Sequence, residues 1–102
     1  MPNYIFAYHG GKRPESPEEG QKEMDKWGAW FAELGDAVVN PGNPVGQSWT
    51  VSSSGVSHDG GANPLSGFTV VQAGSMEAAA TMAKGCPILN GGSVEVAEVM
   101  EM

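Results

Sequence analysis

The chain has 102 residues, enough for one hydrophobic core and too few for two, so we expect one domain over residues 1–102. Hydrophobic residues make up 40% of the chain, and three Trp, three Phe and two Tyr are among them, which indicates a folded globular protein rather than a disordered one. Twelve acidic against five basic residues give a net charge of −7, which disfavours nucleic acid and anionic lipid as partners.

Cysteine content and the first residues bear on the compartment. The single cysteine, Cys86, cannot form an internal disulfide, so nothing in the chain requires an oxidising environment. The start Met1-Pro2-Asn3 lacks the basic flank and long apolar stretch of a signal peptide. No apolar run approaches the roughly 20 residues that span a bilayer. We therefore expect a cytoplasmic protein without a membrane partner.

The first expected element is a strand over residues 4–8, an aromatic and β-branched run that is too short for a helix before the glycines. Alternation gives this strand two rows of side chains: Tyr4, Phe6 and Tyr8 on one face, and Ile5, Ala7 and His9 on the other. Both rows are largely apolar, and one layer of helices covers only one face of a sheet. The pattern therefore predicts a homodimer formed through the open sheet face.

A helix is expected from Ser16 to Leu34. Ser16 is a hydroxyl N-cap, Pro17 occupies the first helical position, and Glu19 stands three residues after the cap. Apolar residues then recur at helical spacing until Gly35 offers a C-terminal cap. The members of this stripe are Met24, Trp27, Trp30, Phe31 and Leu34.

The middle of the chain reads as short strands separated by turns. Residues 37–39 are expected to form the second strand, and the two prolines and one glycine of residues 40–44 indicate a turn. Residues 49–51 are typical of an edge strand, and residues 52–63 of a polar hairpin or loop. Residues 68–73 are expected to form the third strand of the main sheet.

The last part of the chain contains a second helix and a final strand. Ser75 is expected to cap a helix through Lys84 with Met76, Ala79, Ala80 and Ala83 facing inward. Residues 94–99 form the last expected strand. The resulting order β-α-β-(β)-β-α-β predicts an α+β fold, a ferredoxin-like two-layer sandwich with two helices on one face of an antiparallel sheet. This connectivity gathers five segments at one end of the sheet: residues 9–11, the start of the first helix, residues 40–43, residues 63–67 and residues 86–87.

A pocket is expected at that end, and His9 is the candidate catalytic residue. An imidazole titrates near neutral pH and is suited to acid or base work, and Gly10-Gly11 would let backbone approach a ligand closely. The alternative is a strand-end histidine hydrogen-bonded to a loop carbonyl. The two interpretations are evenly balanced.

Four further residues are candidates for substrate binding. Trp30 lies at the edge of the helical stripe and is a candidate aromatic wall, whereas Trp27 is expected to pack in the core. Asn43 and Asn63 lie in proline-bounded loops at the expected mouth. Cys86 follows the C-terminus of the second helix, whose dipole should raise the pKa of the thiol, so a structural role that lines the pocket is favoured over a nucleophile.

Three other patterns in the sequence do not predict a catalytic or binding site. His58 and Asp59 are neighbours whose side chains point apart on an extended chain, which favours a solvated turn over an acid–base pair. Gly10-Gly11-Lys12 lacks the spacing of a phosphate-binding loop. Two histidines and one cysteine, widely separated, do not make a zinc-binding pattern, so no metal or other cofactor is expected.

Several segments together resemble the YCII-related (DGPF-type) domain family. They are the tryptophan-bearing first helix, Gly67-Phe68-Thr69-Val70-Val71 with Ser75-Met76-Glu77-Ala78-Ala79, Cys86-Pro87, and Val94-Glu95-Val96. The resemblance implies small dimers of the dimeric α+β barrel type, mostly of unknown function, with a few lyase-like or dehalogenating relatives.

The catalytic residues of such relatives do not carry over to this chain. Enzyme-like members pair a histidine near the start of the first helix with an aspartate before the proline that follows the second helix. Here residues 18–26 contain no histidine, and Cys86 precedes Pro87. Asp59-Gly60 matches the start of the DGPF motif, but Gly61-Ala62 follows it.

Two functions follow from these observations. The first is binding of a small metabolite in a pocket at the His9 end of the sheet, with lyase or isomerase chemistry in which His9 transfers a proton. The second is a non-catalytic dimeric binding or accessory module with a vestigial site. The sequence does not decide between an enzyme and a binding module.

Overall fold

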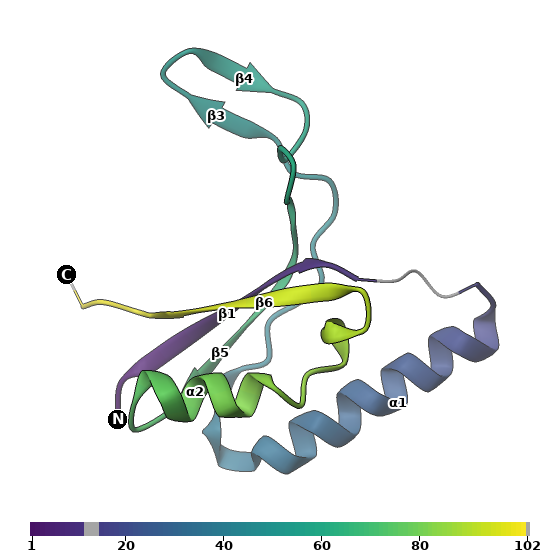
Figure 1. Cartoon of the computed structure of the whole chain (residues 1–102), viewed down its shortest axis with the longest axis vertical. Coiled ribbons are helices and arrows are strands. Elements are labelled where there is room, and N and C mark those ends of the chain that lie inside the picture. The colour runs from purple at the N-terminus through teal and green to yellow at the C-terminus, as the bar shows by residue number, and fades with distance from the viewer. Residues whose placement is uncertain (12–14, 102) are drawn as a thin grey trace.

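A computed structural model describes residues 1–11 and 15–101 (Figure 1). Six strands, two α-helices and two short 3₁₀ turns occur in them. In chain order they are β1 (Asn3–Gly10), α1 (Pro17–Leu34), η1 (Gly35–Ala37), β2 (Val38–Asn40), β3 (Thr50–Ser52), β4 (Gly55–Ser57), β5 (Leu65–Gln72), α2 (Met76–Ala83), η2 (Pro87–Leu89) and β6 (Gly92–Glu98).

The main sheet has four strands in the order β2-β5-β1-β6, and every neighbouring pair is antiparallel. In the centre, Phe6 lies opposite Thr69 of β5 and Val96 of β6. Both helices lie on one side of this sheet (Figure 1). The expected α+β sandwich of ferredoxin-like order is confirmed.

The two helices begin where the hydroxyl caps predict. The Ser16 side chain accepts a hydrogen bond from the Glu19 backbone N–H, and the Ser75 side chain accepts one from the Ala78 backbone N–H. Gly35 ends α1 with φ of 55°, a conformation that favours glycine. Local capping therefore fixes the limits of both helices within a residue or two.

The core lies between the helices and the row of β1 that starts at Tyr4. Phe6 and Val71 are completely buried, and the Phe6 ring lies 6.0 Å from the ring of Trp30. The Trp30 indole N–H donates to the Met82 carbonyl at 3.0 Å, which ties α1 to the end of α2. Ala79 is fully buried, as expected, but Met76 is 43% exposed, so its predicted inward orientation is wrong.

Neither helix of the described residues covers the opposite face of the sheet. Pairing places Ile5 beside Val70 and Ala97, and Ala7 beside Phe68 and Glu95. Ile5, Ala7, Phe68 and Val70 are only half-buried. The alternation in β1 predicted that one face of the sheet is left open. In the structure this open face carries the row of Ile5, Ala7 and His9.

Strands β3 and β4 form a separate two-stranded hairpin rather than an edge of the main sheet. The strand expected at residues 49–51 and the hairpin expected within residues 52–63 are present, but this strand pairs with β4 and not with the main sheet. The hairpin rises on the side of the sheet away from the helices (Figure 1). Its base is tied to β5 by backbone bonds, from Val45 N–H to the Ser66 carbonyl and from Phe68 N–H to the Asn43 carbonyl.

Candidate functional site

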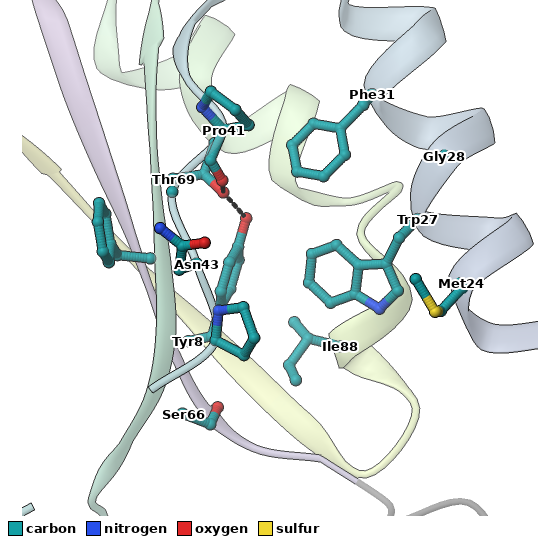
Figure 2. Close-up of a pocket in the computed structure, with 13 residues that line it drawn as sticks. Tyr8, Met24, Trp27, Gly28, Phe31, Pro41, Asn43, Ser66, Thr69 and Ile88 are labelled. Carbon is teal, nitrogen blue, oxygen red and sulfur yellow. Dashed lines mark hydrogen bonds between the residues drawn. The ribbon is translucent and has the colours of Figure 1, made fainter. Parts of the chain in front are cut away.

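A pocket of about 500 Å³ lies between α1 and the sheet, at the end of the sheet where loops were expected to meet (Figure 2). Trp27 and Phe31 of α1 form one wall, Tyr8 of β1 forms the opposite wall, and Ile88 lies between them. Trp27 stands edge-on to Tyr8, with ring centroids 5.1 Å apart. The loop of residues 41–44 completes the rim. This volume falls within the range of small-molecule sites.

Polar atoms form a short chain at one wall of this pocket. The Tyr8 hydroxyl donates to Thr69 Oγ1 at 2.7 Å, and the Thr69 hydroxyl donates to the Pro41 carbonyl at 2.9 Å (Figure 2). Burial raises the pKa of Tyr8, so the phenol stays protonated at neutral pH. Because its proton is committed to Thr69, the Tyr8 oxygen offers an acceptor to a ligand.

Two more polar side chains line the pocket. Ser66 presents a buried hydroxyl oxygen that has no hydrogen-bond partner in the described part of the chain. An unpaired buried hydroxyl is unfavourable, and a bound polar group would satisfy it. Asn43 stands at the exposed rim, where its amide can donate and accept.

The rim loop is shaped by Asn40 and Gly42. The Gly42 backbone N–H donates to Asn40 Oδ1 at 2.9 Å, which closes a tight turn. Gly42 has φ of 72°, and a Cβ at this position would collide with the Phe68 carbonyl. The turn therefore brings the rim against β5 in a way that only glycine permits.

His9 lies on the other face of the sheet. Neighbouring residues of a strand point to opposite faces, so Tyr8 faces the pocket and His9 faces the open side. The His9 side chain is buried beneath the chain that leads into β5, with Nδ1 2.9 Å from the Asn63 carbonyl and 3.3 Å from the Pro64 carbonyl. Its place at the expected end of the sheet is confirmed, but His9 does not line the pocket.

The contacts of His9 indicate where its protons lie. A carbonyl oxygen only accepts, so Nδ1 must carry a hydrogen. Nε2 lies 2.9 Å from Glu95 Oε1 but makes no hydrogen bond in the described part of the chain. The Nδ1 contacts thus hold the base of the hairpin against β1.

Gly10 and Gly11, expected to approach a ligand, approach the protein's own chain instead. Gly11 N–H donates to the Gly91 carbonyl at 3.3 Å, and a Cβ on Gly11 would meet the Ile88 side chain. Their φ angles of 72° and 105° are of the kind that glycine favours. The two glycines therefore serve the packing of β1 against the segment before β6.

The four predicted substrate-binding residues lie in different parts of the structure. Asn43 lines the pocket, whereas Asn63 contributes its backbone carbonyl to His9 on the other face. Trp30 lies in the core at 3% exposure, and its edge borders a smaller hollow near Gly85. Cys86 is also 3% exposed within the core, so the structure brings only Asn43 into the pocket.

The Cys86 thiol stays protonated at neutral pH. Burial raises its pKa to about 11, and a hydrogen bond from the Ile88 backbone offsets only part of this rise. Burial, rather than the helix dipole considered from the sequence, is the largest cause. A thiol with this pKa is a poor nucleophile at neutral pH.

Most residues that line the pocket were not among the sequence candidates, including Tyr8, Ser66, Thr69 and Ile88. Trp27 was expected in the core, yet it forms the wall, while Trp30 takes the core position. The spacing contained a usable signal, because Trp30 lies three residues after Trp27 and four before Leu34, in the middle of the stripe. No local pattern distinguishes the two faces of β1, so Tyr8 had no comparable signal.

Comparison with known protein families shows which family the chain belongs to. The model of the YCII-related domain matches residues 5–102 of the chain. The chain belongs to the YCII-related domain family. No curated protein and no solved structure matches this YCII-related domain.

Across residues 1–11 and 15–101, no three His, Cys, Asp or Glu side chains gather as a metal site requires. Neither of the α-helices described is long and apolar enough to cross a bilayer.

Proposed function

We propose that this YCII-related domain binds a small, flat, uncharged metabolite in the pocket between α1 and the sheet. The observation that supports this proposal most is the composition of the pocket. Among the described lining residues, aromatic and aliphatic side chains dominate and no charged side chain occurs. Such a lining offers no counter-ion to a carboxylate or an amine, and burial of an unpaired charge is costly.

The polar atoms of the pocket suggest what the ligand carries. The Tyr8 oxygen accepts a hydrogen bond, and the Ser66 hydroxyl has no partner of its own in the described chain. A ligand with one donor and one acceptor on an otherwise apolar ring would satisfy both. The aromatic side chains of Trp27, Phe31 and Tyr8 line the pocket, and a flat ring can pack against such surfaces.

Binding without catalysis is better supported than catalysis in this pocket. Acid–base catalysis needs a group whose pKa lies near the working pH. Burial moves the pKa of Tyr8 upward, away from neutrality, and the remaining polar lining consists of hydroxyl and amide groups. We therefore favour the non-catalytic binding module.

Lyase or isomerase chemistry with His9 as the acid–base residue is the second candidate, because His9 Nε2 lies 2.9 Å from Glu95 Oε1 on the open face. Its test is replacement of His9 by Gln, which should abolish turnover of a substrate and leave the thermal midpoint nearly unchanged, because the Gln amide can still donate to the Asn63 carbonyl. Full turnover by that variant would exclude this role.

We also propose that the protein is a homodimer, joined through the open face of Ile5, Ala7, Phe68 and Val70. These half-buried apolar side chains form a continuous surface on the uncovered side of the sheet. Dimerisation of the α+β barrel type would cover it. Light scattering should give twice the monomer mass at micromolar concentration, and a monomer mass throughout would contradict the proposal.

A matched pair of probes tests the pocket. 2-Naphthol and 2-naphthoate share a flat ring system and differ in charge at neutral pH. Calorimetric titration should detect 2-naphthol at least about tenfold more tightly than 2-naphthoate. Equal binding of both probes, or tighter binding of the carboxylate, would contradict an uncharged ligand.

Two tryptophan variants locate the binding. Trp27→Ala removes one wall of the pocket and should weaken 2-naphthol by about tenfold or more. Trp49→Ala makes the same truncation on the exposed hairpin, on the other side of the sheet, and should leave binding unchanged. If both variants bind like the parent protein, the ligand does not occupy this pocket.

A further inference from the structure

The hairpin of β3 and β4 has one apolar face that nothing in the described chain covers. Val51 and Val56 lie opposite each other in the hairpin, and Trp49 stacks on His58 at 4.2 Å between ring centroids. Alternation places these four side chains on one face. Trp49 is 61% exposed, Val51 75% and Val56 54%. The other face carries hydroxyl groups, from Thr50, Ser52 and Ser57.

An isolated two-stranded hairpin is marginally stable in water, and it needs packing against another surface. This hairpin projects from the body of the molecule, and β3 and β4 pack mainly on each other (Figure 1). The radius of gyration is 14.7 Å, whereas a compact domain of this length has about 13 Å. The hairpin is therefore shaped to contact something outside its own chain.

Its position indicates what it contacts. The hairpin rises on the side of the sheet that the helices leave uncovered (Figure 1). A second copy seated on that open face would lie beside the hairpin. Two copies related by a two-fold axis would each place a hairpin against the other.

Charge favours a second copy as this occupant. Asp59 is the only charged residue between Asp36 and Glu77, although the whole chain carries −7. That interval includes β2, the hairpin and β5, and in β6 the open-face row adds one carboxylate, Glu95. Two copies of an acidic protein repel each other least where their surfaces carry no charge. A basic partner would instead be drawn to the acidic remainder of the chain.

We infer that the β3–β4 hairpin packs against a second copy of this chain through Trp49, Val51 and Val56. We call this hairpin the arm. The inference rests on the proposed homodimer and names a contact beyond the open sheet face. Removing the apolar face of the arm should weaken the dimer without disturbing the core, since the arm lies outside the core.

Two double variants test the arm with the same added charge. Val51→Asp with Val56→Asp places two carboxylates on the apolar face, and Thr50→Asp with Ser57→Asp places two on the polar face of the same strands. Sedimentation should show the dimer dissociation constant rising on the order of 100-fold or more for the first pair, because an unpaired charge is buried at the interface. The second pair should dimerise like the parent protein.

The other outcomes are also informative. If the parent protein is a dimer and both variants remain dimers, the arm contact is overturned and the homodimer stands. If both variants dissociate equally, the apolar face has no special role and the inference is overturned. If the parent protein is a monomer at every concentration, the homodimer and the arm fail together.

Hydrogen exchange of the parent protein covers the case in which the first variant does not fold. Amides of residues 50–57 should exchange slowly at high concentration and lose this protection on dilution, while amides of β1 change little. Protection of these amides that does not depend on concentration would overturn the arm contact.

Discussion

The two faces of the central sheet differ in how they are covered, although the same strand supplies both. On the helix side, Phe6 is completely buried and Tyr8 borders the pocket. On the other side, Ile5 and Ala7 remain half-buried, and His9 is occupied in holding the base of the hairpin. The closed face contains the core and the ligand pocket, and the open face contains the surfaces that we assign to a partner.

This difference shows why the most reactive side chain of the sequence is not the centre of the pocket. His9 and Tyr8 are adjacent in the chain, yet the pleat of the strand sends them to opposite faces. The pocket therefore receives a phenol with a raised pKa in place of an imidazole. A binding function follows more directly from such a lining than acid–base catalysis.

The largest expected difference between the faces is in stability. Phe6→Ala should lower the free energy of unfolding by about 3–5 kcal/mol, because it leaves a cavity beneath Trp30. Ile5→Ala, one residue away on the open face, should cost only about 1 kcal/mol in dilute solution. Chemical denaturation measures both. Equal costs for the two variants would mean that the faces are not covered as described.

A smaller effect is expected where His9 holds the hairpin. His9→Leu removes the donor to the Asn63 carbonyl and should lower the free energy of unfolding by about 1–2 kcal/mol. Amide exchange near Leu65 should accelerate more than exchange in α2. Glu95→Gln is the control, because the Glu95 side chain is 71% exposed and should contribute little. An unchanged stability of the His9 variant would contradict this anchoring role.

The smallest expected effect is on the pH dependence of stability. Cys86 has a pKa of about 11 in the folded chain against an ordinary value of 9.0. Between these values the unfolded chain loses the thiol proton first, so stability falls as the pH rises above about 9. The slope should be shallower in Cys86→Ala, and thermal melts at pH 8 to 10.5 measure it. An identical slope in both proteins would show that the Cys86 pKa is not raised.

Much of the fold was predictable because its signals are local. The caps at Ser16 and Ser75, the helical stripe and the order of the elements required only neighbouring residues. The pairing partner of the strand at residues 49–51 was not predictable, because these residues have the same composition whether they pair with the main sheet or with β4. Pairing partners depend on long-range geometry that a local pattern does not contain.

The site was less predictable for a related reason. The end of the sheet followed from chain order, and Asn43 was placed there correctly. The choice of face depends on which row of β1 the helices cover, and both rows are apolar. Ser66 lies at the irregularity where the β1–β5 register shifts, so no period-2 pattern assigns it to the pocket.

Amide chemical-shift mapping by NMR during a titration with 2-naphthol compares the two faces most directly. Shifts should concentrate at Gly28, Gly42 and Thr69, which border the pocket beneath α1. The amides of Ala7 and Glu95, which lie in the open-face row, should change little. Shifts centred on His9 and Glu95, with the residues beneath α1 unchanged, would contradict the assignment of ligand binding to the closed face.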